Sequence, residues 1–161
     1  MQIEVKAVFI DDQLEPLVVE MFHNVYHDYL ARSKKEDKDE YRKVYIIGVE
    51  SLADGSFGVT RDTSDGIIYI SVVDPFLLND SEVSTFDTMF FCETLAHEMV
   101  HAMQAITGTY SDPQVVQIKK METLAKEDKY FFDKHEVEAY VLDSYYGYMF
   151  GESIKRHGEN I

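Results

Sequence analysis

The sequence predicts a single α+β domain in which a small sheet packs against several helices. Two patterns carry this prediction. Short β-branched runs separated by turn residues fill 44–73, whereas apolar residues recur three and four apart over 14–30, 84–108 and 133–151. A chain of 161 residues with 45% hydrophobic composition can bury one core without a second domain. We therefore expect one domain that spans residues 1–161.

The N-terminal part predicts a strand followed by a helix. Between Ile3 and Ile10 apolar and more polar residues alternate, which is the period of a strand with one buried face. From Leu14 to Leu30 the apolar spacing changes to that of an amphipathic helix of more than four turns. The charged run from Arg32 to Lys43 is expected to be a solvated helix end and loop.

The next segment predicts a small sheet. Its apolar runs are 44–49, 57–60 and 67–73, and the dipeptides Asp54-Gly55 and Asp65-Gly66 between them are turn signals. We expect these three strands to form a meander. Together with the N-terminal strand they give a sheet of three or four strands.

The remaining elements are predicted to be helices. Ser84 and Asp87 fit a capping box at the start of the first one, and Gly108 fits its C-terminal stop. This helix is apolar on more than one side, so we expect it to be central. A second helix is expected from Asp112, and a last one from Asp133, which would be its cap.

Charge and cysteine content exclude several classes of protein. Fifteen Lys and Arg against thirty Asp and Glu give a net charge of -15, which repels nucleic acids and anionic membranes. No apolar run approaches the roughly 18 residues of a membrane span. Cys92 is the only cysteine, so no internal disulfide can form. We expect a cytoplasmic protein with Cys92 as inert packing, and a peptide or protein as its partner.

The segment His97-Glu98-Met99-Val100-His101 carries the strongest chemical signal. On a helix its two histidines lie about 40° apart and one turn from each other, so both imidazoles can reach one cation. Two such nitrogens suit Zn²⁺, and Glu98 lies where a carboxylate can take a proton from a metal-bound water. The competing interpretation is that both histidines are hydrogen-bonded core residues.

A catalytic zinc ion needs a third protein ligand and an open position. Three candidates stand close together downstream: His135, Glu136 and Glu138. We favour Glu138, because Glu136 would be occupied at the start of a helix capped by Asp133. His135 lies on nearly the same face as Glu138 and is the second choice.

Leu95-Ala96-His97-Glu98-Met99-Val100-His101 followed by Glu138-Ala139 resembles the gluzincin metallopeptidases, particularly their minimal single-domain forms. The resemblance implies a zincin-like fold, with an N-terminal helix, a small sheet, an active-site helix with HExxH and C-terminal helices that supply the third ligand. It implies zinc on His97, His101 and Glu138, Glu98 as general base, and an edge strand that pairs with an extended peptide substrate.

The chain departs from the gluzincin pattern at one position and leaves another role open. Larger gluzincins carry an aspartate four residues after the ligand glutamate, but here Leu142 stands there and Asp143 comes one residue later. The residue that orients a histidine is thus unassigned. Several residues are candidates for the stabilisation of the oxyanion: Tyr140, Tyr145, Tyr146, Tyr148 and His157.

The expected function is zinc-dependent peptide-bond hydrolysis by a metal-activated water with Glu98 as general base. The main alternative is a zincin-like metal-binding domain that acts as a protein-binding module with little or no catalysis. A di-iron carboxylate site is disfavoured because the ExxH half-motif that ends at His101 has no second copy. A resemblance to the SprT-like proteases of DNA repair would need His135 as a ligand and a basic surface.

Overall fold

The computed structural model describes residues 3–33, 42–63, 65–74, 85–108 and 134–159. Their elements in chain order are β1 (Ile3–Val8), α1 (Leu14–Ser33), β2 (Arg42–Val49), β3 (Gly58–Asp62), β4 (Ile67–Val73), α3 (Thr85–Ile106) and α7 (Lys134–Glu159). The predicted α+β class is confirmed. The helix expected from Asp112 and the two capping residues Ser84 and Asp133 lie outside the described residues.

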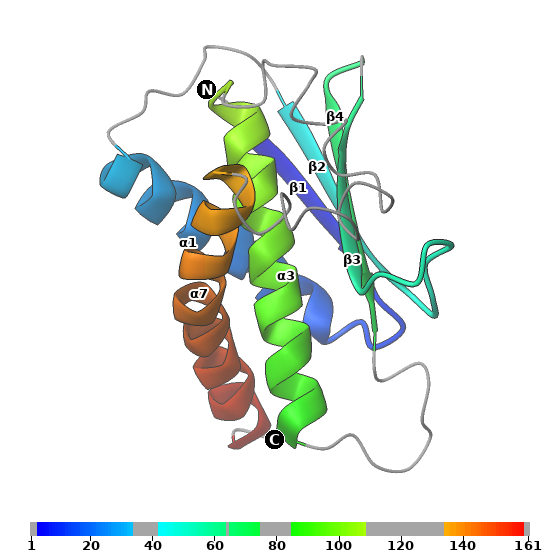
Figure 1. Ribbon diagram of the computed structural model, residues 1–161. Coiled ribbons are helices and arrows are strands. Elements are labelled where there is room, and N and C mark those ends of the chain that lie inside the picture. The colour runs from blue at the N-terminus through cyan, green and yellow to red at the C-terminus, as the bar shows by residue number, and fades with distance from the viewer. Residues whose placement is uncertain (1–2, 34–41, 64, 75–84, 109–133, 160–161) are drawn as a thin grey trace, which may run out of the picture.

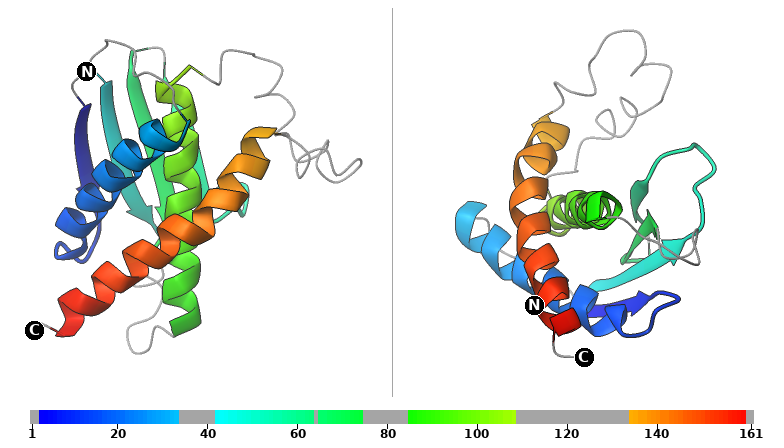
Figure 2. Two further views of the ribbon diagram at one scale, coloured as in Figure 1. Left: turned by 90° about the vertical axis from the view of Figure 1, so that its left-hand side faces the viewer. Right: turned by 90° about the horizontal axis from the view of Figure 1, so that it is seen from below.

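The elements form three layers with α3 in the middle (Figure 1). One side of α3 packs against β3 and β4, and another side packs against α7. Helix α1 covers β1 and also contacts α3 and α7, as the two turned views show (Figure 2). Among the described helices, none combines the length and the apolar character that a membrane crossing requires.

The sheet is mixed and has the strand order β1-β2-β4-β3. The pairs β1–β2 and β2–β4 are parallel, and β3 is antiparallel to β4 at the edge. The predicted meander is therefore wrong, because β2 pairs with β4 and not with β3. The physical reason is composition: β4, and β2 from Val44 on, are mostly apolar and suited to the middle of a sheet, whereas Gly58, Arg61 and Asp62 suit an edge.

The predicted turns and helix end are confirmed by the backbone. Gly55 and Gly66 have φ values of 76° and 83°, a left-handed conformation that favours glycine. Gly108 has a φ value of 79°, and its N–H donates to the Ala105 carbonyl beyond the end of α3. The turn at Gly66 joins β3 to β4, so it fixes the edge strand beside α3.

The core confirms that α3 is central. Residues on several of its faces are at most 2% exposed: Phe91, Cys92, Leu95, Ala96, Met99, Val100, Ala102, Met103 and Ile106. Burial raises the pKa of the Cys92 thiol to about 12, with a smaller contribution from the neighbouring Glu93 charge. Cys92 thus stays a protonated packing residue, as its sequence context predicts.

Candidate metal centre

His97 and His101 lie one turn apart on α3 and are directed at the same point. Their Nε2 atoms are 3.2 Å apart, and the side chains are buried between α3 and α7. The His101 side chain is 3% exposed and that of His97 is 11% exposed. The paired histidines that the motif predicts are therefore brought together.

The third group at this point is Glu136, from the first turn of α7. Its Oε1 lies 2.7 Å from His101 Nε2, and its Oε2 lies 3.1 Å from His97 Nε2. The carboxylate is 2% exposed, so it is held in the interior by these contacts. We expected the Glu136 side chain to be occupied at the start of the helix, but it contacts the two histidines instead.

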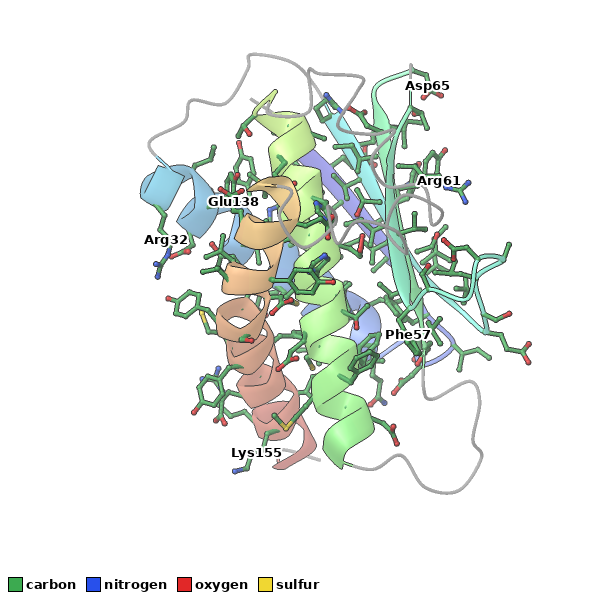
Figure 3. All side chains as sticks on the ribbon, in the orientation of Figure 1. Arg32, Phe57, Arg61, Asp65, Glu138 and Lys155 are labelled. Atoms are coloured by element: carbon green, nitrogen blue, oxygen red, sulfur yellow. The ribbon has the colours of Figure 1, made fainter. Side chains whose placement is uncertain are left out.

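The structure does not bring Glu138, the residue favoured from sequence, to the imidazoles. Its Oε1 accepts hydrogen bonds from the Tyr29 hydroxyl and, at 3.1 Å, from Gln104 Nε2. Figure 3 shows Glu138 on the side of α7 that is turned toward α1. Residues i and i+2 of an α-helix point in directions about 200° apart. Glu136 and Glu138 therefore cannot both face the histidines. The side chain of His135, the other candidate, lies outside the described part of the chain.

Each histidine uses its second ring nitrogen to contact a fixed acceptor. His97 Nδ1 lies 3.2 Å from Asp143 Oδ2, and His101 Nδ1 lies 2.8 Å from Gln104 Oε1. Because Gln104 Nε2 donates to the Glu138 carboxylate, the amide oxygen of Gln104 must be the atom that faces His101. Both Nδ1 atoms therefore carry a proton, which leaves the two Nε2 atoms as the positions for a metal ion, as in metal-binding histidines.

Asp143 and Gln104 were not assigned from sequence. Asp143 lies five residues after Glu138, one more than the gluzincin pattern requires. Relative to Glu136 it lies seven residues on, which is two helical turns and the same face. Gln104 lies three residues after His101, a spacing that also places two side chains on one face.

The spacing of these nitrogen and oxygen atoms is close to that of a metal site. A tetrahedral zinc site with bonds of about 2.0–2.1 Å would separate neighbouring ligand atoms by about 3.3 Å. The two Nε2 atoms are 3.2 Å apart, and the two Glu136 oxygens each lie close to one of them, Oε1 2.7 Å from His101 and Oε2 3.1 Å from His97. Ligand atoms of His97, Glu98 and His101 also lie within 4.8 Å of one another, so this group could hold a metal ion.

In the absence of a metal ion, the neighbouring carboxylates favour the protonated, positively charged form of His97. Burial lowers the pKa of His97, but hydrogen bonds to Asp143 and Glu136 and the charge of Glu98 raise it more, to about 9. Carboxylates on three sides thus favour a cation at this imidazole. The same field favours a bound metal cation.

Glu98 points to the sheet side of α3 and is fixed by the edge strand. Thr60 Oγ1 lies 3.0 Å from the Glu98 carbonyl oxygen and 3.1 Å from its Oε1. Gly58 touches the same side chain so closely that an added Cβ would lie 2.8 Å from Glu98 Cγ. Strand β3 therefore sets where this carboxylate lies.

A cleft of about 610 Å³ opens beside His97 and Glu98. Its walls come from the loop before β3, from α3 and from α7: Gly55, Ser56, Phe57, Gly58, Phe90, Glu93, Thr94, His97, Glu98, Tyr140, Asp143 and Ser144. A ligand in this cleft would touch His97 and Glu98.

Of the described candidates for stabilisation of the oxyanion, only Tyr140 lines the cleft. Tyr140 lines it, and its ring centroid lies 4.5 Å from that of His97. Tyr146 is buried with its hydroxyl on Asp28, and Tyr145 packs under the Arg32 guanidinium. Tyr148 lies along other cavities, and the side chain of His157 is outside the described residues.

Comparison with known proteins identifies no relative: no family model, curated protein or solved structure matches the chain.

Proposed function

We propose that this chain is a zinc-dependent metallopeptidase of the gluzincin type. The observation that carries the proposal is the convergence of His97 Nε2, His101 Nε2 and the Glu136 carboxylate on one point, with both Nδ1 atoms held by other residues. Two imidazoles and one carboxylate beside an open cleft are the ligand set of a catalytic zinc. Calcium and magnesium prefer sites made of oxygen ligands.

Zinc in this position would supply a water of lowered pKa and polarise a peptide carbonyl. Glu98 would accept the proton from that water and later deliver it to the departing amine. Thr60 and Gly58 support this role because they hold the Glu98 carboxylate at the cleft. Tyr140, which lines the cleft beside His97, is our candidate donor to the negative charge that develops on the carbonyl oxygen.

The position of strand β3 supports substrate binding by β-pairing of an extended peptide. It is the outermost strand beyond β4, and it lies against α3 beside the cleft. An extended peptide that pairs with β3 would pass the metal site and Glu98. A protein-binding module with little catalysis would need the same edge but would not need Glu98 fixed at the cleft.

The first test is the metal content of protein purified without chelators, measured by mass spectrometry. We expect about one zinc per chain in the wild type, lost in His101→Ala and Glu136→Ala. Glu138→Gln is the matched control, two residues further along the same helix, and should keep its zinc. Loss of zinc in the control and retention in Glu136→Ala would reverse the ligand assignment, and bound iron in place of zinc would contradict the hydrolase proposal.

Catalysis is tested separately with a library of fluorogenic peptides. Glu98→Gln should keep zinc and lose turnover by at least about a hundredfold, as expected for a general base. If the zinc-loaded wild type cuts no peptide, the binding-module alternative gains support. Full activity in Glu98→Gln would remove Glu98 from the mechanism.

A further inference from the structure

The cleft extends from the metal site along α3 toward the N-terminal end of that helix. Phe90, Glu93 and His97 line it, spaced three and four residues apart on one face. With a rise of about 1.5 Å per residue, Glu93 lies about 6 Å along the axis from His97. That distance is within reach of a long side chain next to the scissile bond.

The outer wall of this part of the cleft is aromatic. The rings of Phe57 and Phe90 meet edge to face, with centroids 4.9 Å apart and an interplanar angle of 88°. Both remain partly open to water, at 55% and 40% exposure. Phe57 projects beside α3 from the loop before β3 (Figure 3). An exposed aromatic pair at the mouth of a cleft is a surface that a substrate side chain would cover.

Of the carboxylates that line the cleft, Glu93 is the one without a described hydrogen bond. Glu98 is bound by Thr60, and Asp143 is bound by His97 and Ser144. Within the part of the chain that the structure describes, no hydrogen bond or ion pair engages Glu93, and no Lys or Arg lines this cleft. Its charge is therefore available to a ligand.

Helix packing fixes the position of Glu93. Gly147 of α7 lies so close that an added Cβ would be 3.0 Å from Glu93 Cα and 3.1 Å from Glu93 Cγ. The close contact holds this stretch of α3 against α7. Glu93 lines the same cleft as Asp143 and Tyr140.

We infer that the site prefers a substrate with a lysine or arginine next to the scissile bond; this inference rests on the proposed peptidase function. The methylenes of that side chain would lie against Phe57 and Phe90, and its cation would pair with Glu93. Long basic side chains combine an apolar stem with a charged head, and their cations also bind aromatic faces favourably. The net charge of -15 would attract a basic peptide and repel an acidic one.

The test uses matched short peptides with lysine, norleucine or glutamate at each position around the cleaved bond. Norleucine keeps the apolar stem and lacks the charge. We expect kcat/KM for the best lysine peptide to exceed that of its norleucine match by about tenfold, equivalent to about 1.4 kcal/mol. Glu93→Gln should remove the difference, and Glu93→Lys should shift the preference to glutamate. Glu152→Gln, an exposed α7 residue outside this cleft, is the control and should change nothing.

Binding of the same labelled peptides to Glu98→Gln, measured by fluorescence anisotropy, separates this inference from the proposed function. Tighter binding of the lysine peptide that is lost in Glu93→Gln/Glu98→Gln would support the inference even if the wild type cuts nothing. Peptides that are cut without preference for lysine would overturn the inference and leave the peptidase proposal standing. A preference for lysine that persists in Glu93→Gln would also overturn it, and peptides neither cut nor bound would contradict both.

Discussion

Glu136 Oε1 lies 2.7 Å from His101 Nε2, so the first turn of α7 contacts the histidine pair of α3 directly. The proposed ligands thus come from two helices, and Glu136 follows His101 by 35 residues in the sequence. A metal bound there would link the two helices in the folded state. In the unfolded chain no such site would exist.

Zinc should therefore raise the free energy of unfolding. A ligand that binds only the folded state adds about 4 kcal/mol at a free concentration a thousand times its Kd. We expect the melting temperature of the wild type to fall when a chelator removes the metal and to recover when zinc is added. Glu136→Ala should show no such change, and an equal zinc response in that variant would place the third ligand elsewhere.

Gly58→Ala should reduce turnover without releasing zinc. The new Cβ would lie 2.8 Å from Glu98 Cγ and 3.0 Å from Thr94 Cγ2, so the Glu98 side chain must move. Misplacement of a catalytic group by about 1 Å can cost about a hundredfold in rate. The measurements are kcat and metal content. Gly151→Ala, whose Cβ would meet nothing within 4 Å, is the control, and unchanged kcat in Gly58→Ala would show that Glu98 tolerates the shift.

Gln104→Leu should weaken zinc binding, because His101 Nδ1 loses the acceptor that fixes its orientation. Loss of such an outer hydrogen bond typically lowers metal affinity by about 10- to 100-fold. Competition with a chromophoric chelator measures the change. Gln13→Leu, an exposed substitution of the same kind, should leave the affinity unaltered. Equal affinity in Gln104→Leu and the wild type would mean that packing alone orients His101.

Tyr29→Phe should reduce stability and leave the zinc in place. Burial raises the pKa of the Tyr29 hydroxyl, as does its hydrogen bond to Glu138, so the group remains a donor at any ordinary pH. Removing it should cost about 1–2 kcal/mol, measured by urea denaturation. Tyr45→Phe, a half-buried position on the sheet, is the comparison. Release of zinc by Tyr29→Phe would indicate that Glu138 takes part in metal binding after all.

The metal-free protein should lose stability as the pH rises. The pKa of His97 is raised from 6.5 to about 9 in the folded state, so folding favours its protonated form. The resulting stabilisation is complete below about pH 6.5 and disappears as the pH passes through about 9. Denaturation of chelator-treated protein across this window measures it, with His97→Leu as the variant that should lack this component. Stability of the wild type that rises over the same window would contradict the assignment.

Several features of the fold follow from local sequence. The helical period places His97 and His101 on one face of α3 whatever surrounds them. The conformation of Gly55 and Gly66 follows from turn chemistry between strands, and the apolar texture around Met99 predicts a helix buried on several sides. These predictions depend only on residues within one helix or turn. The spacing of residue types along the sequence shows how such residues are arranged.

The tertiary structure decided the strand order and which carboxylate contacts the two histidines. A run of residues shows which side chains share a face, but it does not show which face meets which partner. Strand β3 lies at the edge because β2 and β4 offer longer apolar surfaces to each other. Glu136 and Glu138 both find polar neighbours, on opposite sides of α7, so polarity could not distinguish them before the helices were packed.

The sequence by itself determined that two histidines and Glu98 lie together on a central helix of an α+β domain. Only the tertiary structure decided that Glu136 contacts both histidines, that Asp143 and Gln104 lie at their Nδ1 atoms, and that Tyr29 binds Glu138. The reason is the angle at which α7 crosses α3 and α1. That angle results from the packing of many side chains at once, including the close contact of Gly147 with Glu93, and no single segment encodes it.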